Sequence, residues 1–186
     1  MKEIALHLLD LAENSISAKA KTVRIDVRED FRTNQLTAAV EDDGEGMSDE
    51  MVKQVVDPFF TSRTTRKVGL GIPLLKASAE AALGGMKITS KPSAGTRIEV
   101  TFRHSHIDRM PLGDLPCTFL TLTLAHPEIH WIFPYAYTPP YKGQMRKFEF
   151  DDQPLKEAVS GLPLTHPDVL AYLRSTLQDG IAGTRE

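Results

Sequence analysis

An aspartate followed by two glycines, Asp42-x-Gly44-x-Gly46, is the first stretch whose residue types could do chemistry. It ends a strand-like segment, residues 35–42, in which apolar residues take every second position. Asp42 has the same parity as those apolar residues, so the alternation turns its carboxylate toward the core. A buried carboxylate is costly unless a hydrogen-bond donor meets it, and the amino group of a base is such a donor. An ordinary turn at a strand end is the alternative that this stretch alone leaves open.

A second candidate lies on residues 3–19, where apolar residues recur at helical spacing. Asp10 and Asn14 are four residues apart, so their side chains lie one turn from each other on the polar side of this helix. Their oxygens suit a hydrated Mg²⁺. A solvated helix face would explain the same polar side, but asparagine is a poor residue for the middle of a helix.

The third candidate is a glycine pair at the start of a helix pattern. Gly69-Leu70-Gly71 precedes apolar residues at helical spacing as far as residue 83. Glycines in this place let backbone N–H groups approach phosphate oxygens, and the helix dipole adds to the attraction. The preceding loop, residues 61–68, has no apolar pattern and carries three cations: Arg63, Arg66 and Lys67. Such a loop is usually solvated surface, yet here it leads directly to the glycines.

The remaining periodicity indicates the elements that position these residues. Helices are expected over residues 3–19, 48–56 and 72–83, and strands over residues 22–29, 35–42, 86–92 and 96–103. Elements in this order would make a sheet with one face covered by helices.

Residues 104–116 contain glycine and prolines and have little periodicity, so we place a domain boundary there. The predicted units are residues 1–104 and residues 114–186. In the second unit, alternation at residues 118–124 indicates a strand. Further strands are expected at residues 130–137 and 147–150, and helices at residues 154–162 and after a cap at Thr165. We expect a small α+β domain that binds a partner; its histidines are too dispersed to indicate a metal site.

Composition limits the function classes. The chain has 186 residues, of which 41% are hydrophobic and 25% charged, as in globular proteins. The net charge of -3 lacks the basic excess that favours binding to nucleic acid or to an anionic membrane. The single cysteine, Cys117, excludes an intrachain disulfide framework, and no apolar run approaches the length that spans a bilayer. We therefore expect a cytoplasmic protein whose partners include neither nucleic acid nor membrane.

Together and in this order, the motifs resemble those of the GHKL superfamily, which includes DNA gyrase, Hsp90, histidine kinases and MutL. The similar segments are residues 11–18 (N box), 42–46 (first glycine box), 58–61 (F box of histidine kinases), 69–76 (second glycine box) and 95–96 (last glycine box). The resemblance covers residues 1 to about 103 and is closest to the histidine kinase-like ATP-binding domain. It implies the Bergerat fold, an α/β two-layer sandwich of a mixed, mainly antiparallel sheet covered by helices.

The resemblance implies ATP and Mg²⁺ as ligands and assigns residues to the base and the metal. Asn14 matches the Mg²⁺-binding asparagine. Asp42 matches the adenine-binding aspartate, and Gly44 and Gly46 match the glycines beside the base. Thr96 matches the threonine near the adenine.

At the phosphate end, Gly69-Leu70-Gly71 matches the phosphate-cradling glycines. Residues 61–68 would form a short lid, from which Arg63, Arg66 or Lys67 reaches the terminal phosphate. Asp10 stands where hydrolysing members and anti-sigma-factor kinases have a glutamate that acts as general base. The resemblance therefore makes Asp10 the candidate catalytic residue, although its side chain is shorter.

The resemblance implies nucleotide binding more firmly than it implies whether the nucleotide is transferred, hydrolysed or only bound. The chain starts on the N-box helix itself, so we expect an acceptor to be delivered in trans. The first hypothesis is a protein kinase that phosphorylates a partner protein. The second is an ATP-hydrolysing conformational switch, and the third is a non-catalytic nucleotide sensor whose C-terminal unit binds a partner. A homodimer is left open.

Overall fold

Residues 3–57, 71–141, 143–159 and 161–186 are described by the computed structural model. The first part of the chain forms α1 (Ile4–Ser17), β1 (Thr22–Asp30), β2 (Gln35–Asp42), α2 (Asp49–Gln54), α3 (Gly71–Ala81), β3 (Gly85–Ser90) and β4 (Thr96–Arg103). The second part forms α4 (Leu115–Ala125), β5 (His130–Thr138), β6 (Arg146–Asp151), α5 (Gln153–Ala158) and α6 (Pro167–Arg185). The helices and strands expected before residue 104 are confirmed to within a few residues at their ends.

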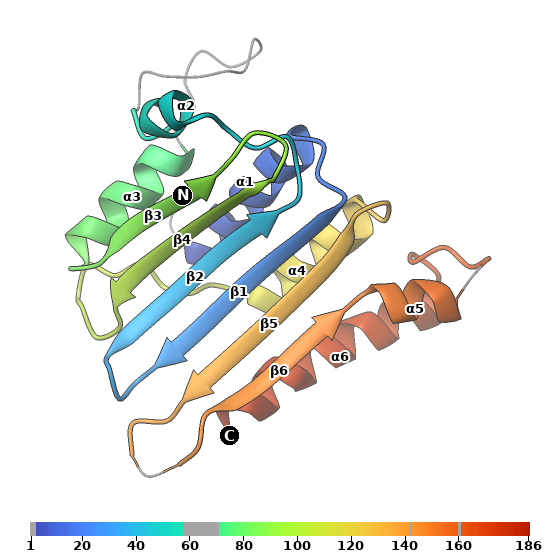
Figure 1. Cartoon of the computed structure of the whole chain (residues 1–186). Helices are drawn as coiled ribbons and strands as arrows, with labels where there is room; N and C mark the ends of the chain where they lie inside the picture. The colour runs from blue at the N-terminus through green and yellow to red at the C-terminus, as the bar shows by residue number, and fades with distance from the viewer. Residues whose placement is uncertain (1–2, 58–70, 142, 160) are drawn as a thin grey trace.

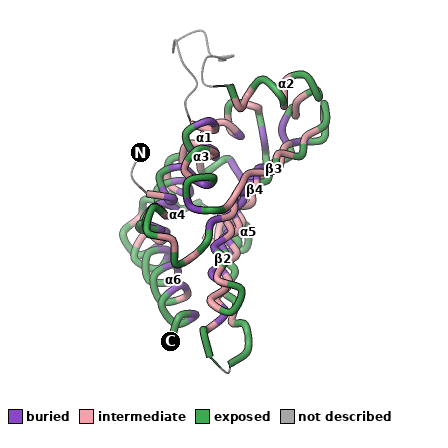
Figure 2. Tube along the Cα trace, turned by 90° about the vertical axis from the view of Figure 1, so that its left-hand side faces the viewer, coloured by how far each residue is buried: buried purple, intermediate pink, exposed green. Residues whose placement is uncertain are grey.

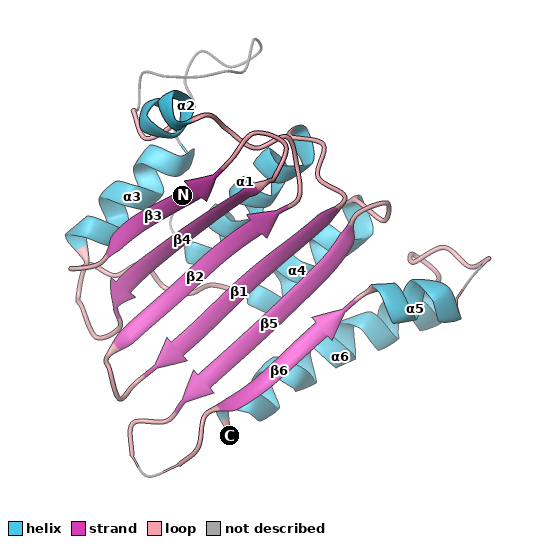
Figure 3. Ribbon diagram, viewed as in Figure 1, coloured by secondary structure: helices cyan, strands magenta, loops and turns pink. Residues whose placement is uncertain are grey.

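The strands form one six-stranded sheet in the order β3-β4-β2-β1-β5-β6 (Figure 1). Strands β1 and β5 pair in parallel, and the other neighbours pair antiparallel. Helices α1, α3, α4 and α6 lie against one face of this sheet (Figures 2 and 3). The expected two-layer α/β sandwich with a mixed, mainly antiparallel sheet is therefore confirmed.

Alternation along the strands separates the two faces of the sheet. Every second residue of β1, β2 and β4 is buried under the helices, among them Ile25, Val40 and Ile98. The residues between them form ion pairs on the open face. Arg97 lies 2.7 Å from Glu41 and 2.9 Å from Glu99. An antiparallel region can keep such a solvated face while the other face forms the core.

The strand predicted at residues 118–124 is wrong, because this segment belongs to helix α4. The Asp114 side chain caps the helix by accepting from the Cys117 N–H at 2.9 Å. The Thr118 and Thr123 hydroxyls donate to the carbonyls four residues earlier, at 2.9 Å in both cases, so they fit a helix. Threonine alternating with leucine gives this segment the two-residue period of a strand. The segment nevertheless forms a helix, because α4 packs against α1 and α6.

A separate α+β domain at the C-terminus is not confirmed. Strand β5 pairs directly with β1, with Trp131 opposite Val23. One hydrophobic cluster contains Ile4 of α1 and Leu177 of α6 together. The expected strands near residues 130–137 and 147–150 are present as β5 and β6, but they extend the first sheet. The cap residue of α6 is His166 and not Thr165.

A buried polar cluster at the far end of β1 joins the C-terminal helix to the sheet. The Glu29 carboxylate accepts from the Tyr135 hydroxyl at 2.5 Å and from Arg185 Nη2 at 2.8 Å. Its second oxygen lies 3.0 Å from His104 Nε2. Burial alone would raise the pKa of Glu29, but these hydrogen bonds and the Arg185 charge outweigh burial and hold the pKa below its ordinary value. The charged form of Glu29 therefore stabilises the fold.

We expect Glu29→Gln to lower the free energy of unfolding at pH 7 by about 1–3 kcal/mol, because buried donors lose their charged acceptor. The folded pKa of Glu29 is depressed, so its contribution is present above the unfolded pKa and is lost as pH falls through the folded value. Urea unfolding at pH 7 and at pH 4 measures this, and the difference between variant and wild type should shrink at the lower pH. Glu149→Gln, at an exposed glutamate, is the control; equal losses in both variants would contradict the account.

Candidate functional site

Three polar residues stand side by side where β2, β3 and β4 meet at one end of the sheet. Asp42 ends β2 and lies opposite Thr96, the first residue of β4. Ser90 ends β3 and lies opposite Thr96 on the other side. Each has the parity of the apolar residues of its strand, so all three lie on the helix-covered face. We call these three residues the polar row.

Helix α1 contacts the polar row through Ser15. Ser15 is only 4% exposed, and its hydroxyl donates to Asp42 Oδ2 at 2.7 Å. The other carboxylate oxygen of Asp42 accepts from the Gly44 N–H at 2.9 Å. A carboxylate has about four lone-pair positions, so Asp42 can also accept from a ligand. The structure thus joins Asp42 to Gly44 and to Ser15 by hydrogen bonds; that Asp42 and Gly44 lie beside a base stays a prediction.

The glycine loop after Asp42 is fixed between two turns. The Glu45 N–H donates to the Ala18 carbonyl at 2.9 Å, and the Glu45 carbonyl accepts from the Ser93 N–H at 2.7 Å. Gly46 has a φ of +65°, and a Cβ there would lie 1.9 Å from the Lys91 carbonyl oxygen. Only glycine fits at this position, because both the dihedral angle and the space exclude a side chain.

Of the remaining candidates, the structure describes Asp10 and Asn14 on α1 and Gly71 at the start of α3. A Cβ at Gly71 would lie 2.0 Å from Asp10 Oδ2, so the start of α3 is close to the Asp10 carboxylate. Asn14 lies one turn after Asp10 on α1 and directly precedes Ser15. Both Asp10 and Asn14 are partly exposed. Helix α1 therefore connects the polar row with the start of α3. Five predicted site residues lie outside the described residues, as does the F-box segment at residues 58–61: Arg63, Arg66, Lys67, Gly69 and Leu70.

Sequence reasoning missed Ser15 and Ser90. Ser90 could have been found by the argument used for Asp42, because it is a polar residue on the apolar parity of a strand end. Ser15 follows Asn14 on a helix, and its partner depends on how α1 lies on β2, which the sequence pattern does not give.

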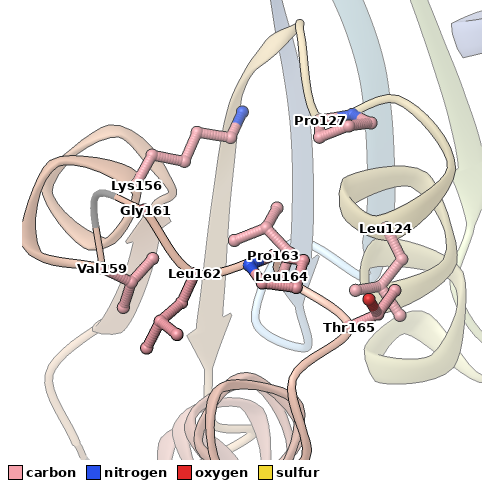
Figure 4. Close-up of a pocket in the computed structure, with 9 residues that line it drawn as sticks. All are labelled: Leu124, Pro127, Lys156, Val159, Gly161, Leu162, Pro163, Leu164 and Thr165. Carbon is pink, nitrogen blue, oxygen red and sulfur yellow. The ribbon is translucent and has the colours of Figure 1, made fainter.

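A cavity of about 370 Å³ lies elsewhere, beside α4 and α5 (Figure 4). It is lined mainly by apolar side chains, with Lys156 at its edge. Lys156 Nζ donates to the Ile129 carbonyl at 2.5 Å and lies 2.6 Å from Asp152 Oδ2. The Lys156 ammonium is therefore already paired within the protein, and it does not make this cavity a phosphate site. Asp152 is also one of three residues, with His130 and Asp151, whose possible metal-ligand atoms lie within 4.8 Å of one another.

No helix in the described part of the chain is both long and apolar enough to cross a bilayer.

The sequence matches a known family over most of the region that builds this site. A profile of histidine kinase-, DNA gyrase B- and HSP90-like ATPases matches residues 2–106. The range contains every predicted site residue, including those that the structure does not describe.

Curated relatives are similar to about half of the chain. The signal transduction histidine-protein kinase AtoS of Escherichia coli is 32% identical over 95 residues, which are 51% of this chain and 15% of that protein. The sensor protein KdpD of Clostridium acetobutylicum is 31% identical over 100 residues, 51% of this chain and 11% of that protein. The heme sensor protein HssS of Staphylococcus saprophyticus is 30% identical over 95 residues, 50% of this chain and 21% of that protein. The chain thus spans only a small part of each relative.

A solved structure extends the likeness of the fold. The crystal structure of the N-terminal domain of a DNA repair protein aligns with a TM-score of 0.54 and 14% identity. The alignment covers 80% of this chain and 52% of that one. At this identity the comparison concerns the fold alone.

We expect Gly46→Ala to destabilise the protein by roughly 2 kcal/mol or more, because alanine would be strained at this φ and would meet the Lys91 carbonyl. The midpoint of thermal unfolding measures the loss. Gly183→Ala is the matched control, since Gly183 lies in α6 with open space around it. That variant should be neutral or more stable by up to about 1 kcal/mol. A Gly46→Ala protein as stable as the control would show that the loop adopts another conformation.

Proposed function

The chain belongs to the family of histidine kinase-, DNA gyrase B- and HSP90-like ATPases, and from this premise we propose that it binds Mg²⁺-ATP and transfers the terminal phosphoryl group to a partner protein. Residues 2–106 are its ATP-binding, histidine kinase-like domain. The observation that carries the proposal is the half-buried Asp42 carboxylate on the helix-covered face, with Ser15 and Gly44 bonded to its two oxygens.

Asp42 holds the base in this proposal. Its position is supported by rigid neighbours, because α1 and the glycine loop both donate to it. The exocyclic amino group of adenine is the complementary donor. Thr96 lies beside Asp42 in the register of the sheet and offers a second polar atom to the base.

The phosphates lie between α1 and the start of α3 in this proposal. The N-terminus of a helix attracts phosphate oxygens through its N–H groups and its dipole. The side-chain oxygen of Asn14 fits Mg²⁺, which prefers oxygen ligands and keeps several waters. When bound, Mg²⁺ supplies charge neutralisation on the phosphates. Arg63 and Lys67 are proposed as cationic contacts to the terminal phosphate.

Asp10 is the proposed catalytic residue. Its carboxylate lies against Gly71, at the end of the site where α3 begins. There it accepts a proton from the attacking hydroxyl or imidazole of the acceptor, while the phosphate-binding groups hold the terminal phosphate in place. The relatives named as histidine kinases support phosphoryl transfer as the outcome. We propose that the acceptor belongs to another protein chain and that residues 114–186 take part in recognising it.

The base site is tested by Asp42→Asn. We expect ATP to bind about tenfold or more weakly, a loss of about 1.4 kcal/mol or more, because asparagine turns one acceptor into a donor. Isothermal titration calorimetry with Mg²⁺-ATP measures the dissociation constant. Asp26→Asn is the control, since Asp26 pairs with Arg97 on the open face of the sheet. Equal affinity in Asp42→Asn and the control would place the base elsewhere.

The outcome of binding is tested with γ-labelled ATP, added to the protein alone and in a lysate of the source cell. We expect label on a partner protein with wild type and loss of that label with Asp10→Ala. Glu13→Gln is the control, because the Glu13 carboxylate contacts His126 at 3.1 Å instead. Release of free phosphate without a labelled partner would favour the ATPase switch. ATP retained intact would favour a nucleotide sensor and overturn phosphoryl transfer.

A further inference from the structure

The Ser90 hydroxyl, which belongs to the polar row, has three hydrogen-bond partners. It accepts from the Met47 N–H at 2.8 Å and donates to the Gly95 carbonyl at 2.9 Å. It also lies 2.8 Å from Thr96 Oγ1, where either oxygen could be the donor. A serine hydroxyl has one proton and two lone pairs, so the three contacts exhaust it.

The single proton of the Ser90 hydroxyl determines which oxygen donates in its contact with Thr96. The Met47 N–H can only donate, so it uses one lone pair of Ser90. The Gly95 carbonyl can only accept, so it takes the single Ser90 proton. The contact with Thr96 is then a hydrogen bond only if Thr96 donates. The reverse direction would leave the 2.9 Å contact between Ser90 and the Gly95 oxygen without a proton.

The donor can be assigned in the same way for the hydrogen bond between Ser15 and Asp42. Ser15 Oγ lies 2.7 Å from Asp42 Oδ2 but 3.4 Å from the Leu11 carbonyl, so its proton belongs to the carboxylate. Asp42 and Thr96 therefore present lone pairs only, side by side at the ends of β2 and β4. A ligand group that faces them must be a donor.

We infer that Ser90 is a specificity-determining residue: by taking the Thr96 proton, it makes the base end of the site accept only, which selects a 6-amino purine over a 6-oxo purine. The inference rests on the proposed function and assigns a role to a residue that does not touch the base. A 6-oxo group would place an acceptor against acceptors, so the ligand oxygen would lack a hydrogen-bond donor at this end of the site. Without Ser90, the Thr96 hydroxyl is free to rotate and donate to that oxygen.

The test compares the dissociation constants of ATP and inosine triphosphate, both with Mg²⁺, in wild type and Ser90→Ala. We expect the preference for ATP to fall by about fivefold or more in Ser90→Ala, the effect of about one hydrogen bond. A merely structural role of Ser90 would weaken both nucleotides equally, and an unchanged ratio would overturn the inference. Ser90→Thr keeps the hydroxyl and should restore the wild-type ratio.

Thr89→Ala removes the neighbouring hydroxyl, which is exposed, and should leave the ratio unchanged. A ratio that falls equally in Thr89→Ala would assign the effect to β3 as a whole and overturn the role of Ser90. If wild type binds ATP and only the Ser90→Ala ratio fails to move, the inference falls and the proposed function stands. If wild type binds neither nucleotide, the proposed function falls and the inference falls with it.

Discussion

The hydrogen bond from Ser15 to Asp42 joins the helix layer to the sheet at the point where the chain keeps a carboxylate on its core face. A charge in this position is tolerated only with donors around it. Ser15 is one donor, and the Gly44 N–H is the other. These two bonds link α1 and the glycine loop to the end of β2. Because Asn14 and Asp10 lie on the same helix, the bond from Ser15 also links the proposed metal-binding and catalytic residues to Asp42.

The two ends of β1 have different roles. Near its first residues, β1 lies beside the end of β2, and the Asp43 carboxylate accepts from the Lys21 and Thr22 N–H groups. Near its last residues, Glu29 binds Tyr135 and Arg185, which belong to the C-terminal part. One strand thus connects the candidate nucleotide site with the segment for which we propose partner recognition. Because both parts share one sheet and one hydrophobic core, the C-terminal part extends the fold of residues 2–106.

Much of the fold followed from periodicity, and the failures have physical causes. The parity of Asp42 and Thr96 could be read from their strands because period two reports the face directly. The sequence did not reveal that β5 pairs with β1, since parallel pairing across a long connection leaves no local pattern. Helix α4 was mistaken for a strand because alternating threonine and leucine satisfy either period, and tertiary burial decides between them. Ser15 was missed because its contact depends on how a helix lies on the sheet.

A crystal structure of the wild-type protein with Mg²⁺ and a non-hydrolysable ATP analogue tests the central claim most directly. The account predicts the 6-amino nitrogen of adenine at hydrogen-bond distance from the Asp42 carboxylate, about 2.7–3.2 Å, with the phosphates at the start of α3. A nucleotide bound in the cavity beside α5, or with its base turned away from Asp42, would contradict the account.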